Sequence, residues 1–238
     1  MNQTVFITGV SSGIGHGLAK FYLDRGDQVY GVSRREPDFI GHDNFQFASI
    51  DVTDAKAVAD RLPILLASVQ KISTVVLNAG ILGQLSDVRD AQIEDLKRIM
   101  DVNVWSNKFV LDSLLERYAI ERVITMSSGA AVNGNRGWSG YSISKAALNM
   151  LTMLYARENE KTFFVAVAPG LVDTAMQDQL CGEPQDPKFA SVEVLKSKRG
   201  TVEMPKPANV AERLVKLFET ADRLVDSGGF VDIRQTDI

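Results

Sequence analysis

Short apolar runs alternate with amphipathic stretches along the whole of this 238-residue chain. Apolar runs bounded by turn residues are typical of buried strands, whereas apolar residues that recur with helical spacing are typical of helices. The predicted strands cover residues 5–8, 28–33, 45–50, 74–77, 122–126, 163–167 and 229–233. The predicted helices cover residues 18–23, 54–68, 93–118, 142–158 and 207–219. Because proline lacks an amide hydrogen, we expect Pro63 to kink or break the second of these helices.

This regular alternation of strand and helix predicts the class of fold. Apolar strands that are covered by helices on both faces favour an α/β fold with a doubly wound, mostly parallel, seven-stranded sheet. The chain contains no internal repeat, no low-complexity segment and no linker. We therefore expect a single domain that spans residues 1–238.

Residues 171–206 depart from this alternation. They contain no clear strand, one predicted short helix at residues 192–198, and the three prolines Pro184, Pro187 and Pro205. Connections of this length in a compact domain usually act as lids or binding loops. We predict a substrate lid here, with a plain surface insertion as the alternative.

Overall composition narrows the range of partners. The formal net charge is -4, and no run of Lys or Arg exceeds two residues, so binding to nucleic acid is not indicated. No apolar stretch reaches the length of a membrane span and no signal peptide is visible, so we expect a cytoplasmic protein without a membrane partner. The single cysteine excludes an internal disulfide, and no Cys/His cluster has metal-ligand spacing, which predicts no metal site.

A glycine-rich turn at residues 8–15, Thr-Gly-Val-Ser-Ser-Gly-Ile-Gly, joins the first predicted strand to the first helix. Glycines allow a tight turn and a close approach of the backbone to a ligand, and the helix N-terminus offers unpaired amides to a pyrophosphate. The alternative is a plain turn, which rarely needs three glycines. We predict a dinucleotide site with contacts from Gly9, Ser11, Ser12, Gly13, Ile14 and Gly15.

The second predicted strand ends at Ser33, and two basic residues, Arg34 and Arg35, follow it. Dinucleotide-binding folds that use NAD commonly place a carboxylate at this point, for the hydroxyls of the adenine ribose. Two guanidinium groups would instead attract a 2'-phosphate. We therefore predict NADP(H) as the cofactor, with a solvated basic pair as the alternative.

Tyr141 and Lys145 lie four residues apart, so a helix would place them on one face, one turn apart. A cation beside a phenol favours the phenolate and lowers the pKa of the tyrosine. Such a tyrosine could exchange a proton with a substrate near neutral pH. Because this spacing is common by chance, its meaning depends on the rest of the chain.

The chain resembles the classical short-chain dehydrogenase/reductase family over almost its whole length. The glycine-rich turn matches the family's cofactor turn, Asn103 matches its helix asparagine, and Ser128, thirteen residues before Tyr141, matches its catalytic serine. Tyr141 and Lys145 complete the set. The resemblance implies a Rossmann-type fold and a nicotinamide dinucleotide. It also implies cofactor contacts by Asp51, Val52, Asn78, Ala79, Gly80, Tyr141, Lys145, Pro169, Gly170, Val172 and Thr174.

The family's chemistry is hydride transfer between nicotinamide and the carbonyl or alcohol group of a small molecule. By resemblance, Tyr141 donates a proton during reduction and Ser128 forms a hydrogen bond with the substrate oxygen. Lys145 tunes the tyrosine and holds the nicotinamide ribose, and Asn103 links this lysine to a proton relay. Three of these residues also have a purely structural alternative: Ser128 as a cap of the strand end, Asn103 as a cap of a helix turn and Lys145 as a surface group. The family usually assembles as homodimers or homotetramers, and we expect the same here.

Four further stretches carry a narrower resemblance: residues 127–131, 137–141, 172–177 and 231–232. They resemble sepiapterin reductases and their bacterial relatives, which include reductases of benzil and other diketones. In sepiapterin reductases an aspartate near the C-terminus anchors the pterin, and Asp232 falls at the matching position. A structural hydrogen-bond acceptor is an equal alternative for Asp232. We assign Trp138 and Met176 to the wall of the substrate pocket.

These observations lead to one main hypothesis, an NADPH-dependent carbonyl reductase that acts on a ketone, a diketone or the side-chain carbonyl of a pterin. A general NADP-dependent alcohol dehydrogenase is the first alternative. The arginine pair argues against it, because cellular NADP is mostly reduced and favours reduction. A non-catalytic dinucleotide sensor is the second alternative, and the presence of all four candidate catalytic residues argues against that.

Overall fold

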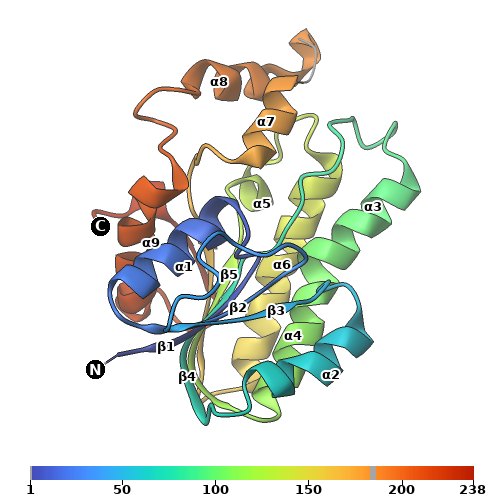
Figure 1. Ribbon diagram of the computed structural model, residues 1–238. Coiled ribbons are helices and arrows are strands. Elements are labelled where there is room, and N and C mark those ends of the chain that lie inside the picture. The colour runs from blue at the N-terminus through green and yellow to red at the C-terminus, as the bar shows by residue number, and fades with distance from the viewer. Residues whose placement is uncertain (1, 183–185) are drawn as a thin grey trace.

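Seven parallel strands form one sheet in the order β3-β2-β1-β4-β5-β6-β7 (Figure 1). The structure is a computed structural model, and it describes residues 2–182 and 186–238. The strands are β1 (Thr4–Thr8), β2 (Gln28–Ser33), β3 (Phe45–Ser49), β4 (Lys71–Leu77), β5 (Ala119–Met126), β6 (Phe163–Ala168) and β7 (Gly229–Asp232). This parallel sheet confirms the predicted doubly wound α/β class.

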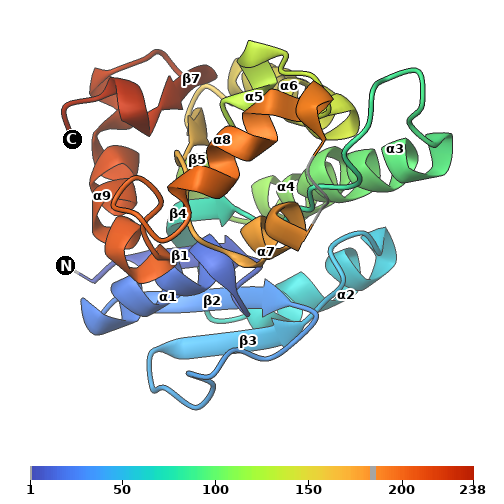
Figure 2. The same ribbon diagram turned by 90° about the horizontal axis from the view of Figure 1, so that it is seen from above.

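Helices cover both faces of the sheet, as Figure 2 shows from above. They are α1 (Gly13–Asp24), α2 (Ala55–Leu65), α3 (Ile93–Met100), α4 (Ser106–Leu115), α5 (Ala130–Asn133), α6 (Ser139–Glu158), α7 (Ala175–Gly182), α8 (Ala190–Lys198) and α9 (Pro207–Thr220). Helices α1 and α9 pack together on one face, and α2, α4 and α6 lie on the other. Short segments α5, α7 and α8 lie at the edge where the strands end.

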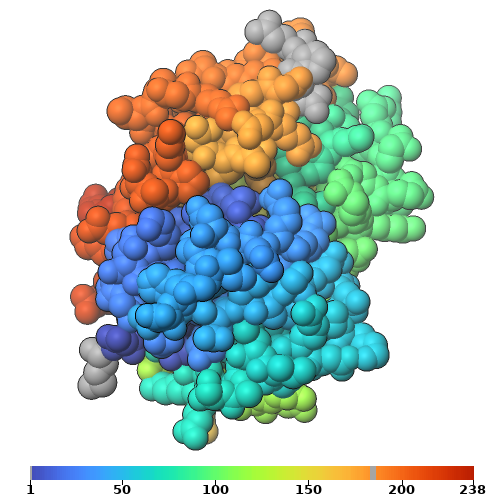
Figure 3. Space-filling view, in the orientation of Figure 1, coloured from blue at the N-terminus to red at the C-terminus, as the bar shows by residue number. Residues whose placement is uncertain are grey.

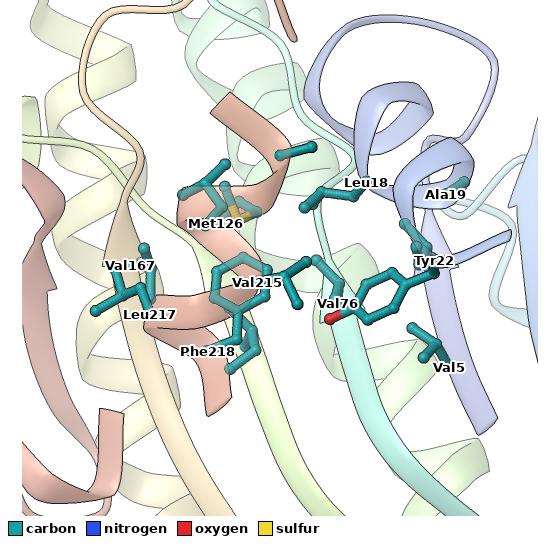
Figure 4. Packing of buried hydrophobic residues seen from close by; sticks show 14 of the residues in the cluster. Val5, Leu18, Ala19, Tyr22, Val76, Met126, Val167, Val215, Leu217 and Phe218 are labelled. Carbon is teal, nitrogen blue, oxygen red and sulfur yellow. The ribbon is translucent and has the colours of Figure 1, made fainter. Parts of the chain in front are cut away.

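Side chains of successive strand residues point to opposite faces, so each strand feeds two apolar cores. Val5 of β1 is fully buried in the cluster beneath α1 and α9, where it joins Tyr22 and Phe218 (Figure 4). Phe6, the next residue, is fully buried in the cluster beneath α2, α4 and α6. Two cores of this kind hold the sheet rigid, so the loops at its carboxyl edge have a firm base.

Several helix boundaries differ from the prediction. Pro63 lies inside the last turn of α2, which ends at Leu65 rather than at residue 68. A proline so close to the end interrupts few hydrogen bonds, so the helix stops soon after it without being divided. Within residues 93–118 the helix is interrupted by a π-helical turn, Asp101–Trp105, and α4 ends at Leu115.

The described residues of the segment 171–206 form α7, a 3-10 turn at Pro187–Phe189 and α8, where the sequence predicts one short helix at residues 192–198. Its described residues contain no strand, as predicted. Residues 183–185 of the predicted lid, and with them Pro184, lie outside the described residues. Among the helices that the structure describes, none is both long enough and apolar enough to cross a lipid bilayer.

Candidate active site

A cleft of about 1280 Å³ opens at the carboxyl edge of the sheet. The turns that follow β1 to β6 line it from below, together with Arg234 after β7, and residues of α7 and α8 line it from above. In the space-filling view of Figure 3, the orange segment that carries α8 stands over the blue N-terminal segment. The strand order reverses between β1 and β4, and ligands of open α/β sheets bind at such a switch point.

The glycine-rich turn forms one end of this cleft. Gly9 and Gly13 have φ values of 78° and 62°, a region that side-chain-bearing residues rarely adopt. A Cβ atom on Gly9 would lie 2.9 Å from Nδ2 of Asn78, which donates a hydrogen bond to the Thr8 carbonyl. Ser12, the N-cap of α1, does not cap the helix with its side chain. The first amides of α1 are therefore available to a pyrophosphate, so the cradle fits a dinucleotide.

Gly15 does not line the cleft, although the sequence analysis assigns it to the cofactor. A Cβ atom there would lie 2.4 Å from the Gly9 carbonyl oxygen and 2.4 Å from Nδ2 of Asn78. Gly15 therefore allows the first turn of α1 to pack against the ends of β1 and β4. Its role is to shape the cradle, and it makes no direct contact with the cleft.

Arg34 and Arg35 are exposed and line the cleft beyond the end of β2. Neither side chain is held in an ion pair with a carboxylate in the described part of the chain. Asp51 lines the same region and accepts hydrogen bonds from the Thr53 amide and hydroxyl, at 3.0 and 2.7 Å. These bonds, with the nearby Arg34, hold the pKa of Asp51 below its ordinary value. This end of the cleft presents two basic groups to an anion.

The other predicted cofactor residues, apart from Gly15, also lie in the lining of the cleft. They come from the turns that follow β3, β4 and β6 and from α6. Those that lie away from the glycine-rich turn and the arginine pair are Val52, Asn78, Ala79, Gly80, Tyr141, Lys145, Pro169, Gly170, Val172 and Thr174.

Tyr141, Lys145 and Ser128 meet where β5 and α6 approach each other. Nζ of Lys145 lies 5.7 Å from the centre of the Tyr141 ring and donates a 2.7 Å hydrogen bond to the Met126 carbonyl. Ser128 forms a side-chain hydrogen bond with Tyr141. Ser127 is engaged elsewhere, by a bond to Asn149 at 2.5 Å. Ser128, rather than Ser127, is thus the serine that interacts with Tyr141.

The acidity of Tyr141 differs from the sequence expectation. Burial raises the pKa of Tyr141 above its ordinary value, and the hydrogen bond with Ser128 opposes this rise only in part. Burial also lowers the pKa of Lys145 to about 8. The predicted lowering of the tyrosine pKa by Lys145 is therefore not found in the protein alone. The physical reason is that desolvation penalises both charged forms at this buried position.

Replacing Lys145 with Met is expected to stabilise the cofactor-free protein at pH 7 by about 2 kcal/mol. Removing the buried charge contributes about 3 kcal/mol, and losing the bond to Met126 costs about 1. Folding lowers the pKa of Lys145 from 10.5 to about 8. Below pH 8 the folded protein therefore bears the full cost of the buried charge. Above pH 10.5 the lysine is neutral in both the folded and the unfolded state, and this cost is absent. The advantage of the variant should therefore shrink as pH rises through this window.

Urea unfolding of the variant and the wild type, at pH 7 and near pH 10, measures this difference. A variant that is less stable than the wild type at pH 7 contradicts the prediction, as does an advantage that grows with pH.

Asn103 lies in the π-helical turn, is fully buried and does not line the cleft. Its Oδ1 accepts a bond from the Ile81 amide at 2.8 Å, and its Nδ2 donates to the Ile81 carbonyl at 2.9 Å and to Ser144 Oγ at 3.0 Å. A Cβ atom on Gly80 would lie 3.2 Å from Asn103 Oδ1 and 3.5 Å from Lys145 Nζ. Asn103 thus ties the loop after β4 to α6 beside the lysine, and its role in a proton relay stays a prediction.

Trp138 and Met176 line the cleft on the side of α7 and α8. The Trp138 ring centre lies 6.0 Å from that of Tyr141, and its Nε1 donates a 2.8 Å hydrogen bond to Ser191 Oγ at α8. Gln179 of α7 donates a 2.7 Å hydrogen bond to the Gly83 carbonyl in the loop after β4. The described part of residues 171–206 therefore covers the region next to Tyr141. Whether it opens and closes as a lid stays a prediction.

Asp232 is placed differently from the other predicted substrate residues. It is only 5% exposed at the end of β7 and does not line the cleft, whereas Arg234 does. The Arg234 guanidinium donates Nε to Oδ1 of Asp232 at 2.9 Å and Nη2 to Oδ2 at 2.5 Å. Arg234 is not among the residues predicted from the sequence. The only signal in the sequence that could have identified Arg234 is its position, two residues after the candidate aspartate Asp232.

The described residues hold no cluster of three or more His, Cys, Asp or Glu side chains suited to a metal ion. The functional groups of the cleft are instead a glycine cradle, a basic pair and a Tyr-Ser-Lys group. The glycine cradle and the basic pair lie toward one end of the cleft, and the Tyr-Ser-Lys group lies toward the other.

Comparisons with known proteins agree with this arrangement. A benzil reductase ((S)-benzoin forming) from Saccharomyces cerevisiae is 34% identical over 198 residues, which cover 76% of this chain and 75% of that protein. A benzil reductase ((S)-benzoin forming) from Bacillus subtilis is 27% identical over 245 residues and covers 98% of this chain and 99% of its own. The crystal structure of a short chain dehydrogenase/reductase from S. cerevisiae superposes with a TM-score of 0.83 at 26% identity, covering 98% and 97% of the two chains.

The model of the short chain dehydrogenase family matches residues 3–184. This match covers most of the chain, including the glycine-rich turn, Ser128, Tyr141 and Lys145. The chain therefore belongs to the short chain dehydrogenase family, whose members are oxidoreductases that use a nicotinamide dinucleotide.

Proposed function

We propose that this protein is an NADPH-dependent carbonyl reductase that reduces one carbonyl group of an apolar diketone. The observation that carries the proposal is that one cleft joins Arg34 and Arg35 at one end to Tyr141, Ser128 and Lys145 at the other. The named activity of two benzil reductases among its relatives supports the diketone. A pterin substrate would use the Asp232 carboxylate, and both oxygens of that group are already bonded to Arg234.

When bound, NADPH supplies the hydride. The chain's own residues act on the carbonyl oxygen. Tyr141 donates its hydroxyl proton to this oxygen, and its raised pKa keeps that proton in place until the oxygen becomes negative. Ser128 donates a hydrogen bond that stabilises the same developing charge. Lys145, still largely protonated at pH 7, is positioned to hold the nicotinamide ribose hydroxyls.

Loss of NADPH absorbance with benzil, with other diketones and with sepiapterin tests this function. We expect consumption with the diketones, with benzoin as the product from benzil. Oxidation of simple alcohols with NADP⁺ but no diketone reduction would favour the alcohol dehydrogenase. Tight NADPH binding without turnover on any carbonyl or alcohol would favour the sensor.

The cofactor preference is a separate expectation. With benzil, kcat/KM for NADPH should exceed that for NADH by roughly tenfold or more, because charged hydrogen bonds to a 2'-phosphate contribute about 1.5–3 kcal/mol. Replacing both Arg34 and Arg35 with Ser should remove most of this preference by raising KM for NADPH. Arg89→Ser is the matched control, because Arg89 is exposed and lies outside the cleft. A tenfold preference for NADH in the wild type would overturn the expectation.

A further inference from the structure

We propose that Arg234, held in place by Asp232, donates a hydrogen bond to a second oxygen atom of the substrate. On this account the site selects vicinal dicarbonyl compounds over matching monoketones. This inference rests on the proposed function and assigns a specificity role to a residue outside the Tyr-Ser-Lys group.

Asp232 holds the Arg234 guanidinium rigidly in place. Asp232 accepts three hydrogen bonds from this residue: from Nε at 2.9 Å, from Nη2 at 2.5 Å and from its backbone amide at 3.0 Å. A bidentate arginine–carboxylate pair fixes the plane of the guanidinium, and Asp232 is itself buried at the end of β7. Arg234 is therefore oriented before any substrate binds.

The Arg234 side chain lies close to the Tyr-Ser-Lys group. The Arg234 side chain passes Gly170, where a Cβ atom would lie 3.5 Å from its Cγ. It reaches Gly129, where a Cβ atom would lie 2.7 Å from its Nη2. Gly129 directly follows Ser128, whose hydroxyl is bonded to Tyr141. The guanidinium thus lies in the cleft lining next to the group that binds the reacting carbonyl.

One nitrogen of the Arg234 guanidinium, Nη1, remains available as a donor. Nη1 of Arg234 forms no hydrogen bond to any residue in the described part of the chain, and the side chain is 54% exposed. Arginine stays protonated at any working pH, so Nη1 can only donate. Because Asp232 offsets the charge of Arg234, the pair presents N–H donors with little net charge. This chemistry fits a neutral carbonyl oxygen.

Arg234 shares the lining of the cleft with several apolar side chains. Trp138, Met176, Leu171 and Leu180 line the same cleft and give it apolar walls. Apolar walls with a few fixed polar groups orient a ligand through its oxygens. A substrate with two adjacent carbonyls between apolar substituents would satisfy Ser128 and Tyr141 with one oxygen and Arg234 with the other.

The test compares benzil with deoxybenzoin, which has the same two phenyl rings but one carbonyl fewer. Arg234→Leu removes the donors and keeps an apolar side chain. With NADPH, we expect kcat/KM for benzil to fall about ten- to a hundredfold, as for loss of a charged hydrogen bond, while kcat/KM for deoxybenzoin stays unchanged. KM for NADPH should also stay unchanged. Equal losses on both ketones, or no loss on benzil, would overturn the inference.

Two further variants make the result specific. Arg223→Leu is the control, because Arg223 is exposed and does not line the cleft. It should leave both ketones unaffected. Asp232→Asn keeps the shape of the side chain and loses its charge, so the arginine is held less firmly. A selective loss on benzil, smaller than that of Arg234→Leu, is expected, and a loss confined to deoxybenzoin would contradict the positioning role.

A binding measurement separates this inference from the proposed function. In the Tyr141→Phe background with NADPH bound, calorimetry gives the Kd of each ketone without turnover. Adding Arg234→Leu should weaken benzil about tenfold and leave deoxybenzoin unchanged. A wild type that reduces neither ketone would reject the proposed function, and the binding result would still decide the role of Arg234. Equal effects on the two Kd values would reject that role.

Discussion

Replacing Tyr141 with Phe is expected to lower kcat for benzil by at least about a hundredfold and to leave the affinity for NADPH unchanged. The substitution removes only the hydroxyl that is bonded to Ser128. Proton transfer from a positioned group is typically worth about a hundredfold to ten-thousandfold. The ring remains beside Lys145 and Trp138, so the cleft keeps its shape. Steady-state kinetics and an NADPH titration measure the two quantities.

Tyr155→Phe is the matched control for this experiment. Tyr155 lies on the same helix, α6, and its hydroxyl donates to Asp112 at 2.5 Å, away from the cleft. Its loss should reduce stability a little and leave kcat unchanged. Turnover that survives in Tyr141→Phe would reject this tyrosine as the proton donor.

Replacing Gly15 with Ala is expected to destabilise the protein by about 2 kcal/mol and to weaken NADPH binding. The new Cβ atom would meet the Gly9 carbonyl and Asn78 at 2.4 Å, a distance that requires movement of the cradle backbone. Overpacking of this kind costs about 3 kcal/mol, and the better helix propensity of Ala returns about 1. Urea unfolding and an NADPH titration measure the two effects.

Gly182→Ala is the matched control, because no atom of the described residues lies within 4 Å of the position of its added Cβ atom. This control should be as stable as the wild type and bind NADPH equally well. A Gly15→Ala protein that also behaves like the wild type would show that close packing at this turn does not shape the cofactor site.

The fold could be predicted from the sequence because its two main signals, the apolar runs and the glycine-rich turn, are local patterns. Apolar runs such as residues 163–167 are long enough to identify strands, and the parallel sheet confirms them. The cofactor turn is also a local pattern, so its position between β1 and α1 could be predicted. The role of Gly15 could not, because it depends on the distance to Asn78, a residue far away in the sequence.

Other features of the site depend on tertiary structure. The pKa of Tyr141 rises because its side chain is buried in a cluster with Trp138, Leu180 of α7 and Val192 of α8. The four-residue spacing to Lys145 reports nothing about that burial. The π-helical turn around Asn103 and the pairing of Asp232 with Arg234 depend likewise on the surroundings. Helix α7 was not predicted from the sequence, because its residues are only weakly amphipathic.

The central claim is that this cleft directs hydride from NADPH to a carbonyl carbon. Incubation with benzil and NADPH that is fully deuterated at C4 of the nicotinamide tests it most directly, with the product analysed by mass spectrometry and NMR. The account predicts benzoin with one deuterium on its carbinol carbon, formed in proportion to the NADPH consumed. Unchanged NADPH, or benzoin without deuterium, would contradict it.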